Sequence, residues 1–331
     1  MLHVRVCTPT ERHTGLVEEL ELHGAVCNIV VMVGAARKPD GDVVEFDVAR
    51  EAANGVISSL RARNLHRVGS ITVERIDMSM SDAAAAAEVH APGDPSDAVV
   101  WEEVEARVRA DAGWSVSLNA LLVIAALIGA IGVLVDSPIL LVGAMVVGPE
   151  FGPIASIAFG LHTRRLARVR RGVVALGIAL PTAIAAAAML TWLLRLLGRI
   201  PLTYLAGERP MTSFISSPDL FAVIVAVLAG VAGAVSLTEA RHGALVGVLI
   251  SVTTIPAAAN IGVALAMSRS GEAAGAFAQL SLNLVILAVA GAATFRLQAI
   301  ALGRLTGPKQ LNRSSRLTSP TSARSEGEPP C

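Results

Sequence analysis

One carboxylate interrupts an apolar stretch that is long enough to cross a lipid bilayer. Residues 143–159 read GAMVVGPEFGPIASIAF, and Glu150 stands in the middle of them. An ionisable side chain at membrane depth is energetically costly and marks a candidate path for ions or substrates. Glu150 could therefore bind a proton or a cation. Two structural alternatives remain open: a hydrogen bond that locks Glu150 to a neighbouring helix, and exposure to a water-filled vestibule.

Glycine and proline flank this carboxylate on both sides. Gly148 and Pro149 precede Glu150, and Gly152 and Pro153 follow it. Proline removes a helix hydrogen-bond donor and clashes with the carbonyl four residues earlier, so the pattern predicts a broken helix. Broken backbone at membrane depth needs protein or a water-filled cavity around it, so these five residues are candidates for a transport or binding site.

A second interruption is predicted at Pro256, in a later apolar stretch. Asn260 lies one turn beyond this proline and could face Glu150, while Gln279 and Asn283 belong to the last apolar stretch. An interhelical hydrogen bond is the structural alternative for each of the three amides. Pro256, Asn260 and Asn283 complete the set of candidate site residues.

Other polar groups near these stretches have a structural role in our interpretation. Thr253 and Thr254 are expected to satisfy carbonyls that Pro256 leaves free, since neighbouring hydroxyls can do so. Asp136 follows the first apolar stretch and is interpreted as a charge at a helix end or at the mouth of a path.

The composition indicates an integral membrane protein that is mainly α-helical. Of 331 residues, 53% are hydrophobic and 16% are charged, which is more apolar than an ordinary soluble domain. We expect about six spans, each near the length that a hydrocarbon core of roughly 30 Å requires. The predicted spans are residues 118–135, 138–161, 172–194, 220–237, 243–267 and 273–295, within a transmembrane domain over residues 115–298.

Charge is distributed unevenly along the chain, although the formal net charge is zero. Residues 1–112 carry 11 Lys and Arg against 19 Asp and Glu, and residues 162–171 hold five arginines. Positive charge collects on the cytoplasmic side of membrane proteins, so we predict a plasma (inner) membrane protein with both termini in the cytoplasm. Residues 299–331 are rich in Ser, Thr, Pro and Arg and are expected to form a disordered tail.

Residues 1–78 have the pattern of a small α+β domain. Strands are predicted at residues 3–9, 25–34, 43–48 and 70–76, and helices at residues 10–22 and 50–65. This β-α-β-β-α-β order is that of the ferredoxin-like fold. Residues 79–97 are expected to form a linker. Residues 98–114 are expected to form an amphipathic helix that leads into the membrane and has Val100, Val104 and Val108 on one face.

The apolar segments fall into two sets of three that resemble each other. Residues 123–135 and 224–235 each carry a Gly-x-x-Gly pair, and a Leu-Val-Gly triplet follows in both sets, about ten residues before Pro153 and Pro256. The two sets would cross in opposite directions, so we expect a 3+3 inverted repeat with broken helices, an arrangement that places a transporter site near the midplane. Chance similarity among helices rich in Ala, Gly and Leu is the alternative. The glycine pairs are Gly129/Gly132 and Gly230/Gly233.

These residues also resemble a known family. Gly143–Ala144–Met145, Pro149, Gly152–Pro153–Ile154 and Gly160 are similar to the signature of a bacterial and archaeal membrane family known only as a conserved domain of unknown function, DUF389. The resemblance covers roughly residues 115–295 and implies a multi-pass membrane body, without implying a substrate. The chain departs from the family pattern at Glu150, where many members look apolar. It departs again at Ile255–Pro256, where a Pro-Pro pair is common.

Other residue patterns argue against catalysis and against cofactors. The sequence has no Ser-His-Asp ordering, no His-Glu-x-x-His motif and no phosphate-cradling loop, so we predict no enzyme. His3, His13 and His23 fall on different predicted elements, and the three cysteines show no metal spacing, so we expect no metal and no cofactor. A basic stripe that would bind nucleic acid is absent from the sequence.

Three functions fit this organisation. The favoured hypothesis is a transporter or channel for a small solute or ion, with its site at broken spans two and five and Glu150 as the binding or coupling carboxylate. The alternative is a membrane-anchored sensor or regulator whose cytoplasmic domain binds a ligand or partner. A scaffold held together by its amino-terminal domains is the third. We expect a homo-oligomer in the lipid bilayer, which fits all three.

Overall fold

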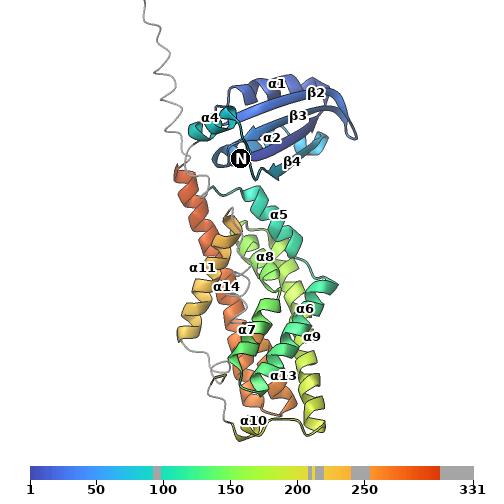
Figure 1. Ribbon diagram of the computed structural model, residues 1–331, viewed down its shortest axis with the longest axis vertical. Helices are drawn as coiled ribbons and strands as arrows, with labels where there is room; N and C mark the ends of the chain where they lie inside the picture. Colours follow the sequence, from blue (N-terminus) through green and yellow to red (C-terminus); the bar gives the residue numbers. More distant parts are fainter. Residues whose placement is uncertain (92–97, 208–210, 213–219, 240–253, 306–331) are drawn as a thin grey trace, which may run out of the picture.

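The computed structural model describes residues 1–91, 98–207, 211–212, 220–239 and 254–305. A small sheet domain lies at one end of an elongated helical bundle, and helix α5 (Trp101–Asp111) lies between them (Figure 1). Several predicted features fall outside the described residues: the first half of the span at 243–267, Thr253, the end of the linker and nearly all of the tail.

The amino-terminal domain is a four-stranded antiparallel sheet with helices packed on it. Its sheet order is β2-β3-β1-β4, and every neighbouring pair of strands is antiparallel. Strand β3 thus lies between β1 and β2, the two strands that α1 joins, which is the split β-α-β arrangement expected from the order of elements. The elements are β1 (Leu2–Thr8), α1 (Thr10–Glu21), β2 (Val26–Arg37), β3 (Asp40–Val48), η1 (Arg50–Ala52), α2 (Ala53–Ala62), α3 (Leu65–Val68) and β4 (Ser70–Arg75).

Alternation along the central strands builds the core of this domain. Successive side chains of a strand point to opposite faces, and Leu2, Val4 and Val6 of β1 are all fully buried on one face. The facing helices supply the other side of the core. Its helical members include Leu16, Leu20, Val56, Ile57 and Leu60.

The segment predicted as a linker contains a helix. Helix α4 (Asp82–His90) starts at Ser81, whose hydroxyl accepts a hydrogen bond from the backbone N–H of Ala84 at 3.4 Å. Ala84 and Ala87 are buried, and α4 packs against β2. The linker interpretation of residues 79–97 is therefore wrong for α4, because a run of five alanines has high helix propensity without any apolar periodicity to reveal it.

The described part of the bundle contains four helices that are long and apolar enough to cross a membrane. They are α6 (Val116–Leu134), α9 (Leu166–Leu196), α11 (Leu220–Thr238) and α14 (Ser270–Leu305). These helices correspond to the predicted spans one, three, four and six. A short helix, α10 (Leu202–Ala206), lies at the end of the bundle that is far from the sheet domain (Figure 1).

The two remaining predicted spans differ from continuous helices. The second is a bent pair, α7 (Pro138–Val147) and α8 (Phe151–His162), with an angle of 62° between them. Of the fifth, the described residues hold α13 (Ile255–Ala266), which is 12 residues long and too short to cross alone. Six spans are therefore not confirmed; the described residues give four, or five if the bent pair is one span.

Glycines allow close contact between helices of the bundle. A Cβ atom added to Gly129 of α6 would stand 2.9 Å from the Cβ of Ala259, and one added to Gly230 of α11 would stand 2.9 Å from the Cβ of Ala290. Both distances are too short for real side-chain atoms. Gly129 and Gly230 thus bring α6 against α13 and α11 against α14, as small residues do in membrane helix pairs, while Gly132 lies against α7.

Candidate functional site

Two helices begin inside the bundle, and a polar residue stands at the start of each. Glu150 is the N-cap residue of α8, and Thr254 is the N-cap residue of α13. The first N–H groups of a helix have no partner within the helix, so proline is tolerated in the first turn. Pro153 and Pro256 both occupy this turn.

The break in the second predicted span lies at Gly148 and Pro149, as expected, and not at Pro153, which was expected to contribute to it. Gly148 ends α7 in an extended conformation, with φ −70° and ψ 120°, and Pro149 follows it directly. A residue before proline is disfavoured in the helical region, so Gly148 and Pro149 interrupt the chain together. Pro153 does not break a helix, because at its position in α8 no hydrogen bond is lost.

The two N-cap side chains contact each other. The hydroxyl of Thr254 donates a hydrogen bond to Oε1 of Glu150 at 2.6 Å, and both residues are completely buried. Neither side chain caps its own helix. Each helix start carries a partial positive charge, so the starts of α8 and α13 together stabilise negative charge at this point. The sequence interpretation gave Thr254 a role toward freed carbonyls and missed this contact.

Gly148 lies directly against this pair. A Cβ atom at Gly148 would stand 2.5 Å from Oε2 of Glu150 and 2.9 Å from the side chain of Ile255. A larger residue at this position would displace either the carboxylate or the start of α13. Glycine is thus required here by close approach and not by a positive φ angle.

The three predicted amides are all buried. Asn260 is 1% exposed, and its Oδ1 has no hydrogen-bond partner among the described residues. In the described part of the chain no hydrogen bond joins Asn260 to Glu150, and it is Thr254 that donates to this carboxylate. Gln279 donates to Oδ1 of Asn283 at 3.2 Å, one turn apart on α14.

A Thr residue just before Ile-Pro at a helix start was the available signal for Thr254. Threonine is a common N-cap residue, and proline is favoured in the first turn that follows.

Asp136 also has partners: it accepts hydrogen bonds from the N–H of Met211 at 3.3 Å and the hydroxyl of Thr212 at 2.8 Å. Asp136 therefore holds two segments together at the end of α6.

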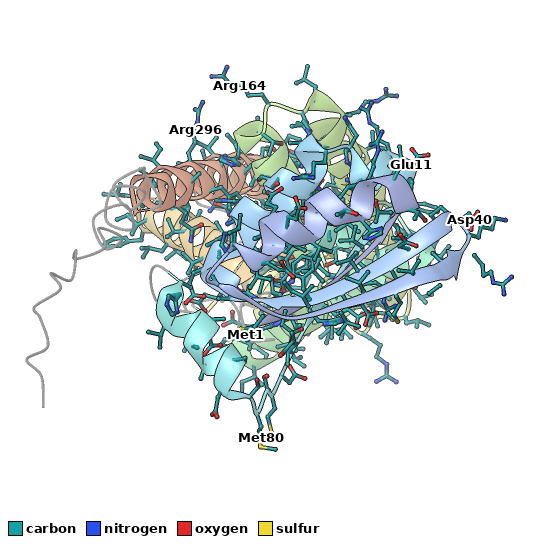
Figure 2. All side chains as sticks on the ribbon, turned by 90° about the horizontal axis from the view of Figure 1, so that it is seen from above. Met1, Glu11, Asp40, Met80, Arg164 and Arg296 are labelled. Atoms are coloured by element: carbon teal, nitrogen blue, oxygen red, sulfur yellow. The ribbon has the colours of Figure 1, made fainter. Side chains whose placement is uncertain are left out.

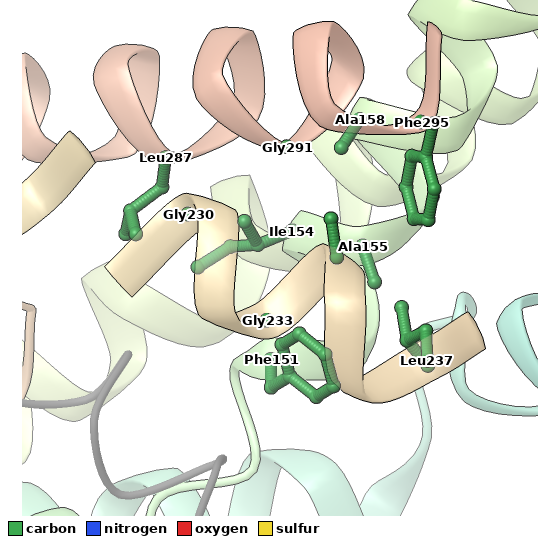
Figure 3. A pocket seen from close by; sticks show the side chains of 11 residues that line it. Phe151, Ile154, Ala155, Ala158, Gly230, Gly233, Leu237, Leu287, Gly291 and Phe295 are labelled. Carbon is green, nitrogen blue, oxygen red and sulfur yellow. The ribbon is translucent and has the colours of Figure 1, made fainter. Parts of the chain in front are cut away.

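An apolar crevice lies beside the start of α8. It runs between α8, α11 and α14, and Figure 3 shows Phe151 and Leu237 on one side of it and Leu287 and Phe295 on the other. Its volume of ≈ 20 Å³ is close to that of a single water site, and its lining is apolar. The crevice is a packing defect between helices and not a solute site.

Metal-binding groups do not gather in the described residues. No cluster of three or more His, Cys, Asp or Glu side chains that could hold a metal ion occurs there.

Residues 145–289 match the profile of the domain of unknown function DUF389. The chain carries a DUF389 domain. The matched segment begins in α7 and ends in α14, so Glu150 and Thr254 both belong to the DUF389 domain, whereas α5 and the sheet domain precede it. Comparison with curated proteins and with solved structures gives no match. The DUF389 domain and the four long apolar helices of the described residues are consistent with a membrane protein of unknown function.

Proposed function

We propose that the protein is a transporter or channel for a small solute or ion, with its site where α8 and α13 begin. The observation that carries this proposal is the 2.6 Å hydrogen bond between Thr254 and Glu150, made by two half-helix starts inside an apolar body. Interrupted helices that meet in this way form substrate and ion sites in known transporter architectures. A buried carboxylate at such a point is a functional-site hypothesis by default.

The proposal includes an inverted repeat of two halves, and helix packing supports it. In the first half α6 and α8 both pack on α9, and in the second half α11 and α13 both pack on α14. The halves also interlock in the same way, since α8 packs on α14 and α13 packs on α9. Within this repeat α8 corresponds to α13.

We also propose that the sheet domain faces the cytoplasm in the plasma membrane. Glu105 of α5 forms ion pairs with Arg165 and Arg168, so the sheet domain and the arginine-rich connection lie at the same end of the bundle. Seen from that end, Arg164 and Arg296 project outward past the sheet domain (Figure 2). Clustered arginines at one end support a cytoplasmic orientation.

The test is a flux measurement in proteoliposomes across a panel of cations, anions and small metabolites. Glu150→Gln keeps the size of the side chain and removes its charge, and we expect it to abolish flux in a protein that remains folded. Glu239→Gln is the matched control, because Glu239 is exposed just beyond α11 and should leave flux unchanged. Normal flux through Glu150→Gln would show that the carboxylate is not the site.

The second candidate function is a membrane-anchored sensor. The observation in its favour is that the sheet domain makes specific polar contacts with α5, including an ion pair between Arg50 and Glu103 at 2.8 Å, and that α5 in turn packs on the bundle. A sensor requires a ligand or partner on residues 1–77, and deletion of these residues should then remove every response of the protein.

A further inference from the structure

We infer that α5 controls the position of the helix break, with Gly152 as the point of contact. Under this inference the sheet domain regulates the site at Glu150 through a rigid helix. The inference rests on the proposed function for the meaning of the site, but the mechanical connection can be measured separately. Three sets of contacts carry it: α5 to the sheet domain, α5 to the bundle, and α5 to the break.

The start of α5 is fixed to the sheet domain by Asn54 of α2. The amide of Asn54 donates to the carbonyl of Val99 at 2.6 Å, and its Oδ1 accepts from the N–H of Trp101 at 3.2 Å. Arg50 adds a hydrogen bond to the carbonyl of Ala98 at 3.0 Å besides its ion pair with Glu103. The first turn of α5 therefore follows any movement of α2.

The sides of α5 are held less tightly to the sheet domain. An open hollow of ≈ 360 Å³ lies beside α5, next to Arg61 of α2, and an ion pair between Arg61 and Glu102, whose charged atoms lie 3.4 Å apart, joins the two helices there. Arg61 is half exposed, so this pair contributes little stability. The space beside α5 leaves room for the helix to tilt about its attached start. The hollow is lined by Arg61, Glu102, Glu105, Ala106, Arg109 and Ala110.

The inner face of α5 packs on the bundle. Val104 and Val108 are buried against Ala155 and Phe159 of α8. The Trp101 ring stacks on His162, with 5.4 Å between ring centroids, and meets the edge of Phe295 of α14 at 6.4 Å. Separating α5 from α8 would expose these apolar and aromatic side chains to water, so we expect the two helices to move together.

The end of α5 abuts the first turn of α8. A Cβ atom at Gly152 would stand 2.5 Å from the carbonyl oxygen of Asp111 and 2.7 Å from its Cβ. Asp111 is the last residue of α5, and Gly152 is two residues beyond Glu150. The negative end of α5 thus meets the positive end of α8, which is a favourable arrangement of helix dipoles. A tilt of α5 would shift the turn that positions Glu150.

Gly152 is accordingly a positioning residue, which acts on Glu150 through the first turn of α8. Asn54 of the sheet domain contacts the start of α5, and Gly152 of the bundle contacts its last residue. The two contacts therefore lie at opposite ends of one 11-residue helix. If α5 connects them, the effects of changing both residues are not additive. Independent structural roles would give additive effects.

The experiment compares full-length variants in lipid nanodiscs by hydrogen exchange and in proteoliposomes by flux. Asn54→Ala removes both hydrogen bonds to α5, and we expect exchange in peptides covering residues 148–158 to rise about threefold or more. Asn28→Ala is the matched control, because Asn28 donates to Asp47 at 2.7 Å in the sheet domain and makes no contact with α5 among the described residues. It should leave residues 148–158 unchanged.

The second arm uses two glycines. Gly152→Ala should alter exchange at residues 148–158 and flux, whereas Gly177→Ala, which has no atom within 4 Å of the added Cβ, should alter neither. Adding Asn54→Ala to Gly152→Ala should then produce no further change. If Asn54→Ala misfolds, Glu103→Gln replaces it, since that change removes the ion pair with Arg50.

The two proposals fail in different ways. Absence of flux from folded wild-type protein would overturn the transport proposal, and the exchange data would still decide the coupling. Unchanged exchange at residues 148–158 in Asn54→Ala, or additive effects of Asn54→Ala and Gly152→Ala, would overturn the coupling whether or not flux is seen.

Discussion

The hydroxyl of Thr254 and the carboxylate of Glu150 are joined at 2.6 Å although 104 residues separate them in the chain. This bond lies in the interior of the bundle, where α8 and α13 both start. Each residue occupies an N-cap position, and each turns its side chain toward the opposite helix. The bond therefore links the starts of two helices, α8 and α13, that are far apart in the chain.

Thr254→Val should destabilise the folded bundle, because valine matches the shape of threonine and cannot donate to a buried carboxylate. Loss of one partner from a buried hydrogen bond reduces stability by about 1–3 kcal/mol. Thr254→Ser keeps the hydroxyl and should retain most of this stability. Thermal unfolding in one detergent measures both variants; equal stability of the two would mean that the hydrogen bond is unimportant.

Gly148→Ala should be more harmful than Gly143→Ala, although both glycines belong to the same segment. The new methyl group at Gly148 would meet Glu150 and Ile255, and overpacking of this kind reduces stability by about 1–3 kcal/mol. Gly143 has no atom within 4 Å of an added Cβ, so alanine there should be neutral or stabilising. Unfolding and flux of the two variants provide the comparison, and a reversed order would contradict the geometry at the break.

Asp42 should make the sheet domain sensitive to acid. The backbone N–H of Gly34 donates to this carboxylate at 2.7 Å and the hydroxyl of Thr10 at 3.1 Å, and these bonds lower the pKa of Asp42 below its usual value. Because the pKa is lower in the folded state than in the unfolded state, the ionised carboxylate stabilises the folded domain above about pH 4. This stabilisation is lost as the pH falls through the folded-state pKa.

Asp42→Asn removes this dependence. Exchange of amides in β1 and β3, corrected for the intrinsic effect of pH, should show the variant less protected than wild type at pH 6. The difference should shrink toward pH 3. A difference that stayed constant with pH would exclude a role for the ionised carboxylate.

Cysteines at the two ends of the bundle should be labelled from opposite sides of the membrane. Arg164 lies in the connection between α8 and α9, and Ser268 is exposed between α13 and α14. In a protein whose three native cysteines are replaced, Arg164→Cys should react with an impermeant reagent only in inside-out vesicles. Ser268→Cys should react only in right-side-out vesicles. Labelling of both from one side would refute the proposed topology.

The strands and helices of the sheet domain could be predicted closely, because patterns between neighbouring residues in the sequence indicate them. Leu2, Val4 and Val6 alternate along β1 and are all buried, so period and burial agree. Helix α4 could not be predicted in this way, because its alanines have a high helix propensity but form no apolar face that a periodic pattern would reveal. For α5, the spacing of Val104 and Val108 correctly indicated the buried side.

The candidate site could be predicted only in part. Glu150 stood out because a charge in an apolar stretch is rare, and the structure buries it completely. Its partner depends on how two distant helices pack, which no local pattern encodes, so Asn260 was chosen where Thr254 makes the contact. Pro153 was interpreted as a helix breaker, although a proline in the first turn is a sign that a helix begins.

The meeting of two buried helix starts also has a consequence for biogenesis. A nascent chain that has inserted α6 to α9 already carries Glu150, but Thr254 has not yet been synthesised. The hydrogen bond that Thr254 donates to the Glu150 carboxylate can therefore form only after the second half of the chain has been made. The contact between the starts of α8 and α13 is thus a late step of assembly, whereas the contacts of α6 with α7 and of α8 with α9 need only the first half of the chain.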